Sequence, residues 1–298
     1  MSHLHESRIK ELEEKANDIR ISVIESLIEA GSGHTAGPLG MADVFALLYF
    51  HTLKHDPKNP EWDERDRLIL SNGHICPVLY AAMAHSGYFP VEELKTLRKF
   101  GSRLQGHPHR EFLPGIESSS GPLGSGLSQG VGMALGERMN NKESGKMFYV
   151  LMGDGELDCG QIWEAAMHAG KEKLHNLIGI IDRNGIQIDG FTKDVMPLED
   201  LRAKWESFGW HVVEADGHDF NAMHEAIGEA QSFYSKPSVI IAHTVPGKGV
   251  EEFERDFRWH GTPPGKGPED RVPKQKQGKV ALDRLRTLGG KIEASHND

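Results

Sequence analysis

An acidic turn between two apolar runs constrains the fold more than any other part of this sequence. The first run, 147–152, leads into a Gly-Asp-Gly-Glu turn that contains Asp154. The second run, 177–181, leads into an Asp-Arg-Asn-Gly turn that contains Asn184, and residues from about 159 to 171 repeat apolar side chains at helical spacing. Such a strand–helix–strand unit is a right-handed crossover with its ligands at the carboxyl ends of the strands. The spacing therefore predicts that Asp154 and Asn184 lie at one edge of a parallel sheet.

The residues at this edge carry oxygen ligands. Asp154 can supply a charged oxygen, Asn184 a neutral one, and the Ile186 carbonyl a third. Hard oxygen ligands suit Mg²⁺ or Ca²⁺, and Mg²⁺ usually shares such sites with phosphate groups. Gly153 and Gly155 let the backbone turn sharply and let a diphosphate approach without a Cβ in the way. Although an isolated Gly-Asp-Gly is most often a plain turn, the flanking strand, helix and Asn184 favour a metal-bridged diphosphate.

At this point the sequence resembles the transketolases, whose thiamine diphosphate motif runs from Gly-Asp-Gly to an Asn about thirty residues later. The residues around the motif and four segments outside it carry the resemblance, and they occur in the same order as in the family. The motif region is 153–190, and the four segments outside it are 32–42, 70–74, 121–126 and 259–263. The resemblance covers roughly residues 10–265.

The resemblance implies an α/β fold, with a mainly parallel sheet and helices on both faces, of the pyrophosphate-binding type. It implies thiamine diphosphate and Mg²⁺ as cofactors, with Ca²⁺ as a substitute, and Asp154, Asn184 and the Ile186 carbonyl as metal ligands. The other implied cofactor contacts are His74, Gly155 and His260 at the diphosphate, Gly121, Pro122 and Leu123 beside the aminopyrimidine, and Ile188 near the thiazolium ring. The implied catalytic residues are His34, His74, His107 and His260.

Four histidines are candidates for proton transfer. In a ketol transfer the donor's C3 hydroxyl loses a proton as the C2–C3 bond breaks, and the acceptor aldehyde later gains one. Neutral imidazoles can do both. We expect His34 and His260 to handle these protons, His74 to serve mainly the diphosphate, and His107 to contact the donor's hydroxyls. The simpler interpretation of each is a loop histidine that makes a structural hydrogen bond.

The resemblance covers only the first half of a transketolase. The half that follows in that family binds the aminopyrimidine and carries most of the arginines that grip the sugar phosphate. This chain therefore resembles the N-terminal subunit of a split transketolase. The implied partner is a separate C-terminal subunit, in an α₂β₂ heterotetramer that acts on sugar phosphates of the pentose phosphate pathway. The chain alone is expected to be inactive.

One position departs from the family pattern. Cys159 stands where transketolases usually have a glutamate that is thought to link the two active sites of a dimer. The neighbouring Asp158 is expected to point elsewhere on the helix. The metal ligands are unaffected, but communication between active sites is put in doubt.

The remaining sequence alternates strands with helices, which is typical of a parallel α/β sheet. The expected strands are 67–70, 210–213 and 237–243, and the expected helices are 8–30, 38–50, 75–86, 127–142, 199–208 and 220–234. Segment 99–126 is a long loop, which in a compact domain is usually functional or disordered. The polar tail after about residue 268 favours a solvated helix over a partner contact.

Composition narrows the partners and the compartment. The 298 residues fit a single α/β domain, 1–298, and the net charge of −10 argues against non-specific binding of nucleic acid. The sequence has no apolar stretch long enough to span a bilayer, and the charged N-terminus is unlike a signal peptide. Two cysteines make no disulfide framework, which fits the cytoplasm.

Three alternatives stay open from the sequence. One is a transketolase-like enzyme for an unusual sugar, such as a sulfo- or branched sugar, because the residues that grip the substrate lie in the other half. Another is the alpha subunit of a 2-oxo acid dehydrogenase, which shares the cofactor motif. The third is a non-catalytic cofactor-binding protein, although such a protein needs none of the histidines that face the substrate.

Overall fold

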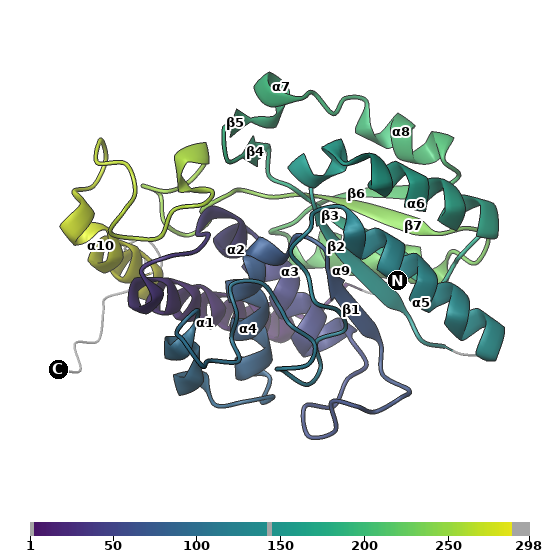
Figure 1. The fold of residues 1–298 in the computed structure, drawn as a ribbon, viewed down its shortest axis with the longest axis horizontal. Coiled ribbons are helices and arrows are strands. Elements are labelled where there is room, and N and C mark those ends of the chain that lie inside the picture. Colours follow the sequence, from purple (N-terminus) through teal and green to yellow (C-terminus); the bar gives the residue numbers. More distant parts are fainter. Residues whose placement is uncertain (1–2, 142–144, 288–298) are drawn as a thin grey trace.

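A parallel five-stranded sheet lies at the centre of the molecule (Figure 1). The computed structural model describes residues 3–141 and 145–287. The strand order is β1-β2-β3-β7-β6. Its strands are β1 (Arg67–Leu70), β2 (Phe148–Gly153), β3 (Leu177–Arg183), β6 (His211–Asp216) and β7 (Ser238–His243). A short antiparallel ribbon, β4 (Ile186–Gln187) with β5 (Gly190–Phe191), follows β3.

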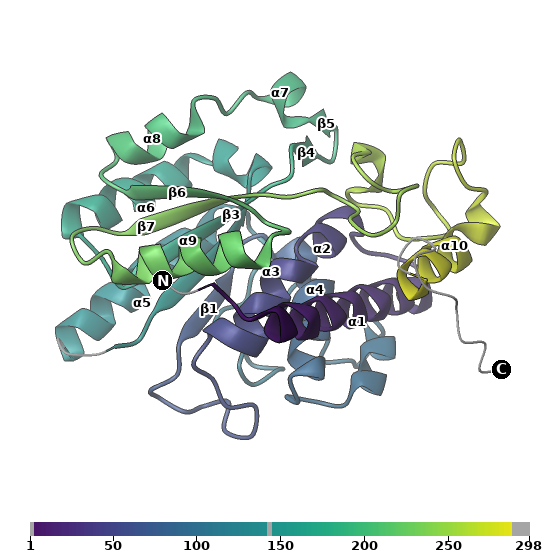
Figure 2. The ribbon, with the colours of Figure 1, turned by 180° about the vertical axis from the view of Figure 1, so that it is seen from behind.

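The central strands β2, β3 and β7 are buried on both faces, so each reads as a nearly continuous apolar run. The edge strand β6 alternates buried and more exposed residues. On β2, Tyr149 and Leu151 belong to one core and Val150 and Met152 to the other. The first core is shared with α1, α3, α4 and α9, and the second with α5, α6 and α8 (Figures 1 and 2). The helices are α1 (Glu6–Ala30), α2 (Ala36–Gly40), α3 (Ala42–Leu47), α4 (Cys76–His85), α5 (Ser125–Asn140), α6 (Gly160–Glu172), α7 (Thr192–Val195), α8 (Leu201–Ser207), α9 (Phe220–Ser232) and α10 (Lys274–Arg286). The predicted fold class is therefore observed.

The helix predicted over 38–50 is broken into α2, α3 and a wider helical turn over 48–52. The break lies at Met41, beside Gly40, where a Cβ would come within 2.9 Å of the carbonyl oxygen of Val245. The amide of Gly247 also donates to the carbonyl of Ala36 at 2.8 Å. This close packing joins α2 to the loop after β7, a tertiary contact that no local sequence pattern indicates.

The polar tail forms helix α10, and the expectation of a solvated helix is wrong for one of its faces. Gln277, Ala281 and Leu285 are buried, and α10 packs along α1. The amide side chain of Gln277 accepts hydrogen bonds from the backbone N–H groups of Gly265 and Gly267, at 3.0 and 3.1 Å. The charges lie on the remaining faces, so α10 is an integral part of the domain. The end of the predicted tail, 288–298, lies outside the described residues.

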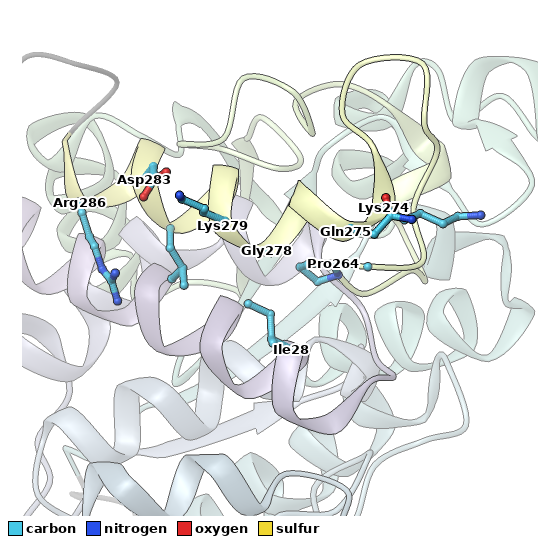
Figure 3. A pocket seen from close by; sticks show the side chains of 10 residues that line it. Ile28, Pro264, Lys274, Gln275, Gly278, Lys279, Asp283 and Arg286 are labelled. Carbon is cyan, nitrogen blue, oxygen red and sulfur yellow. The ribbon is translucent and has the colours of Figure 1, made fainter. Parts of the chain in front are cut away.

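An open groove of about 740 Å³ lies along α10, where this helix faces Ile28 of α1 (Figure 3). Ile28 and Leu282 give it an apolar wall, while Lys279, Asp283 and Arg286 place charges along its rim. None of the predicted site residues lines it. Within residues 3–141 and 145–287, no helix is both long and apolar enough to cross a membrane.

Candidate active site

A cavity of about 280 Å³ lies beyond the carboxyl ends of β1, β2 and β3. Every predicted site residue except Pro122 lines it, and both chain neighbours of Pro122 do so. The lining residues are His34, Asn72, His74, His107, Gly121, Leu123, Gly153, Asp154, Gly155, Glu156, Asp182, Asn184, Ile186, Gln187, Ile188 and His260. Segments that are far apart in the sequence thus meet in one place.

The pairing of β2 with β3 brings the candidate metal ligands together. The amide of Asp154 donates to the carbonyl of Asp182 at 3.2 Å, which continues the ladder one residue past the strand end. The amide of Gly185 then donates to Oδ2 of Asp154 at 2.7 Å. Both polar atoms of the Asn184 side chain are hydrogen-bonded. Its Nδ2 donates to the Asp182 carboxylate at 2.7 Å, and its Oδ1 accepts from the backbone N–H of Ile186 at 3.0 Å.

Asp154 lies beside a second carboxylate, Asp182, in the cavity wall. Its side chain is buried and accepts from Nη1 of Arg183 at 3.0 Å. Burial raises the pKa of Asp154 and raises that of the adjacent Asp182 to about 7, to which the Asp154 carboxylate also contributes. A cation in the cavity would stabilise both carboxylates in their charged form.

The donor set also limits which metal would bind. Among residues 3–141 and 145–287, no three His, Cys, Asp or Glu side chains form a cluster that could hold a metal. The predicted ligands, the Asp154 carboxylate, the Asn184 amide and the Ile186 carbonyl, include one side chain of these types and line the cavity together. Oxygen ligands of this kind, completed by phosphate oxygens and water, suit Mg²⁺ better than a soft transition metal.

Glu156 is a lining residue that the sequence did not single out. Its Oε1 accepts from the Ser71 hydroxyl and, at 2.6 Å, from the amide of Gly124, while Oε2 accepts from the amide of Gly153 at 3.0 Å. One buried carboxylate thus holds the loop after β1, the loop before α5 and the turn after β2. Its place in the Gly-Asp-Gly-Glu turn was the one sign in the sequence that Glu156 belongs to the site. Its role could not be predicted, because its partners Ser71 and Gly124 lie in distant segments.

The other lining residues that were not predicted adjoin predicted ones. Asn72 precedes His74 by two residues, Asp182 precedes Asn184 by two, and Gln187 follows Ile186 directly. The cavity walls therefore follow the chain continuously at each strand end. A prediction limited to motif positions could not find these neighbours.

Three of the four candidate histidines are in ring contact. The ring centroids of His34 and His74 are 4.7 Å apart, those of His74 and His260 are 5.2 Å apart, and those of His34 and His260 are 5.5 Å apart. His107 lines the same cavity from the long loop. Nδ1 of His34, Nδ1 of His260 and Oδ1 of Asn72 are buried and have no hydrogen-bond partner among the described residues. Unpartnered polar atoms in a cavity wall fit a polar ligand.

The histidines are held neutral at physiological pH. Burial, with further contributions from His260, His107 and Arg98, lowers the pKa of His34 to about 4. Burial lowers the pKa of His74 well below its usual range, and the neighbouring His34 adds to this. Partial burial, followed by the charge of Arg98, lowers the pKa of His107, and burial lowers the pKa of His260. Neutral imidazoles can accept a proton from a hydroxyl, whereas imidazolium groups cannot.

The lowered pKa of His34 predicts a pH-dependent stability. Between the ordinary pKa of 6.5 and about 4 the unfolded chain binds the proton and the folded chain does not, so stability falls as the pH falls through this window. Between pH 7 and pH 5, the unfolding free energy of the wild type should fall by about 2 kcal/mol more than that of the His34→Gln variant. Urea denaturation at both pH values measures this. His168→Gln, which changes an exposed histidine of α6, is the control and should lose as much stability as the wild type. If His34→Gln also lost as much stability as the wild type, the lowered pKa of His34 would be contradicted.

Cys159 lies immediately before α6, against the loop that lines the cavity. A Cβ on Gly124 would approach the Cβ of Cys159 to 2.8 Å. Burial, followed by Glu156 and Asp158, raises the pKa of the Cys159 thiol, so it stays protonated. Asp158 instead accepts from Nε2 of Gln187 at 3.0 Å. Asp158 belongs to the short helical turn 155–158 that precedes α6, where it is engaged with Gln187.

The sequence comparison decides the family. Residues 12–280 match the family described as transketolase, thiamine diphosphate binding domain. The chain belongs to the transketolase family. The comparisons confirm that it is a transferase and that it has the predicted α/β fold.

Single subunits of transketolases occur among the similar proteins. The 6-deoxy-6-sulfo-D-fructose transketolase subunit of a Clostridium species is 45% identical over 250 residues, which are 84% of this chain and 90% of that protein. An apulose-4-phosphate transketolase subunit of Phocaeicola vulgatus is 40% identical over 266 residues, which are 89% of this chain and 94% of that protein. This transketolase-family chain thus aligns with nearly the full length of both proteins.

Longer transketolases match over less than half of their own length. Transketolase 2 of Escherichia coli is 42% identical over 273 residues, which are 88% of this chain and 41% of that protein. A crystal structure of a transketolase mutant from Pichia stipitis superposes with a TM-score of 0.84 at 34% identity, over 96% of this chain and 41% of that one. The chain therefore spans less than half of these transketolases.

Proposed function

We propose that this chain is the thiamine diphosphate-binding subunit of a two-chain transketolase. Together with a separate C-terminal subunit it transfers a two-carbon ketol unit from a ketose phosphate to an aldose phosphate. The observation that carries the proposal is the single cavity that joins an oxygen ligand set at Asp154 and Asn184 with four histidines. The match to a thiamine diphosphate-binding domain supports the cofactor.

Each wall of the cavity has a role in this proposal. Asp154, Asn184 and the Ile186 carbonyl hold Mg²⁺, or Ca²⁺ in its place, against the diphosphate, and His74 adds a contact to the diphosphate. When bound, thiamine diphosphate supplies the reactive carbon and the electron sink. The protein supplies position and charge, and Glu156 fixes the three loops that form the walls.

The remaining histidines act on the sugar. His34 and His260 are neutral and have unpartnered Nδ1 atoms, so each can accept a proton and return it. In the proposed roles they take the proton of the donor's C3 hydroxyl and deliver one to the acceptor's carbonyl oxygen. His107, on the long loop that precedes α5, contacts the donor's other hydroxyls.

A modified sugar is a second candidate substrate. Two similar subunits are named for 6-deoxy-6-sulfo-D-fructose and for apulose 4-phosphate, at 45% and 40% identity. In the family the residues that bind the far end of the sugar lie in the other half, so this cavity does not separate the sugars. Assays of the two-chain enzyme with each sugar would choose between them.

The family match supports a transketolase over the alpha subunit of a 2-oxo acid dehydrogenase. An α₂β₂ assembly in the cytoplasm, acting on the sugar phosphates of the pentose phosphate pathway, is the arrangement that we propose. The similarity to nearly the full length of two proteins named as subunits supports a separate partner chain.

We expect ketol transfer only when the partner subunit is present. The tagged chain, purified from its own cells with Mg²⁺ and thiamine diphosphate, should convert xylulose 5-phosphate and ribose 5-phosphate. The chain alone should not, because it aligns with less than half of a longer transketolase and the proposal assigns aminopyrimidine binding to the partner. Turnover by the chain alone at about 1 s⁻¹ or faster, a rate typical of enzymes, would contradict the two-chain proposal.

The other outcomes of this experiment discriminate between the alternatives. A partner that co-purifies without ketol transfer from these substrates would point to another donor sugar. The absence of any partner, together with the absence of activity, would favour a non-catalytic cofactor-binding protein.

A further inference from the structure

Two buried side chains of α4 contact the loop that carries His107. The hydroxyl of Tyr80 donates to the carbonyl of Gln105 at 2.9 Å. The thiol of Cys76 donates to the carbonyl of Gly106 at 3.2 Å. Both side chains are 1% exposed, whereas the loop from 98 to 124 contains no helix or strand. The two carbonyls immediately before His107 are therefore fixed by a rigid helix.

Arg98 also contacts this loop. The amide of Arg98 donates to the carbonyl of Leu104 at 2.9 Å. Its guanidinium lies so close to Gly106 that a Cβ there would meet Nη1 at 2.9 Å. Gly106 is thus enclosed between α4 and Arg98, and the loop has little freedom to shift at this point.

His107 depends on this backbone contact for its position. Its ring has no side-chain hydrogen bond or ring contact within residues 3–141 and 145–287, and the residue is exposed. The ring Cγ lies 3.9 Å from the position of a Cβ on Gly121, across the cavity wall. A side chain without partners of its own is placed by its backbone, and a misplacement of about 1 Å at an active site can cost 10²-fold in rate.

We propose that Tyr80 and Cys76 are positioning residues for His107, because their two hydrogen bonds fix the carbonyls that precede it. The proposal rests on the proposed function, in which His107 contacts the donor sugar. Tyr80→Phe removes one donor and keeps the ring in the core, so it should lower kcat/KM of the two-subunit enzyme about 5- to 10-fold. Cys76→Ala should act in the same direction, and Cys76→Ser, which keeps a donor, should restore most of the loss.

A double-mutant cycle separates positioning from a general structural effect. In the His107→Ala background Tyr80→Phe should change kcat/KM less than about twofold, because the group that it positions is gone. Tyr149→Phe is the matched control, since Tyr149 is a fully buried tyrosine that is hydrogen-bonded to Gln231 and lies outside the cavity. It should leave kcat/KM unchanged. An equal loss from Tyr80→Phe in both backgrounds would overturn the proposal.

A second measurement needs no enzymatic activity. Diethyl pyrocarbonate modifies accessible imidazoles, and mass spectrometry of the full chain gives the modification rate of His107. Tyr80→Phe should change that rate at least about threefold while the rate at the distant His168 stays constant. If the wild-type complex has no ketol transfer, the proposed function fails, yet this rate still tests the positioning. An unchanged rate at His107 would overturn it.

Discussion

Asp154→Ala is expected to abolish the Mg²⁺-dependent retention of thiamine diphosphate, weakening binding at least about 100-fold in the two-subunit enzyme. This carboxylate is the charged ligand of the proposed set, and it lies at the carboxyl end of β2, joined to the Asn184 turn through the Gly185 amide. Gel filtration of the complex in Mg²⁺, followed by quantification of the cofactor that stays bound, measures the effect. Normal retention in Asp154→Ala would remove the metal assignment.

A more conservative change separates the loss of a ligand from a loss of fold. Asp154→Ala also leaves the Arg183 guanidinium and the Gly185 amide without their acceptor, which costs stability. Asp154→Asn keeps an acceptor and removes the charge, so it should stay folded in a thermal melt and still fail to retain the cofactor. Asp194→Ala, an exposed carboxylate on α7, should behave like the wild type.

The second large effect is expected at the proton-handling pair. His34→Ala and His260→Ala should each lower kcat/KM of the two-subunit enzyme by about 10²- to 10⁴-fold, the usual range for a lost acid–base group. Their rings are 5.5 Å apart, so both can reach one substrate. If they act on the same proton, the double variant should be little worse than either single one, because groups that act as a unit are not additive. Coupled steady-state assays over a range of donor concentrations measure this.

Cofactor retention distinguishes these roles from a binding defect. His34→Ala should retain thiamine diphosphate, because His34 is placed toward the sugar and not toward the diphosphate. His168→Ala, on the exposed surface of α6, is the matched control and should keep full activity. A loss smaller than about fivefold in His34→Ala would exclude it as an acid–base group.

The strands and the strand-end site were predictable because both depend on short-range patterns. An apolar run that ends in a glycine turn fixes the end of a strand, and parallel pairing then fixes which strand ends meet. Asp154 and Asn184 could therefore be placed together from their positions alone. The histidines at 34, 74 and 260 required the family resemblance, since no local pattern shows that three distant loops converge.

What could not be predicted depends on contacts between distant segments. Glu156 binds Ser71 and Gly124, and neither partner is apparent from the sequence around it. The buried face of α10 did leave a signal, because Ala281 and Leu285 are spaced four residues apart, as on one side of a helix. The surrounding charges obscured that spacing, which is why the tail was expected to be solvated.

The packing of α10 along α1 has a consequence for synthesis on the ribosome. The first helix of the domain completes part of its apolar surface only against the last one, so the nascent chain exposes that surface until α10 has left the exit tunnel. Exposed apolar surface on an incomplete domain is prone to aggregation. Chaperones that bind nascent chains should therefore remain on this surface until α10 has packed against α1.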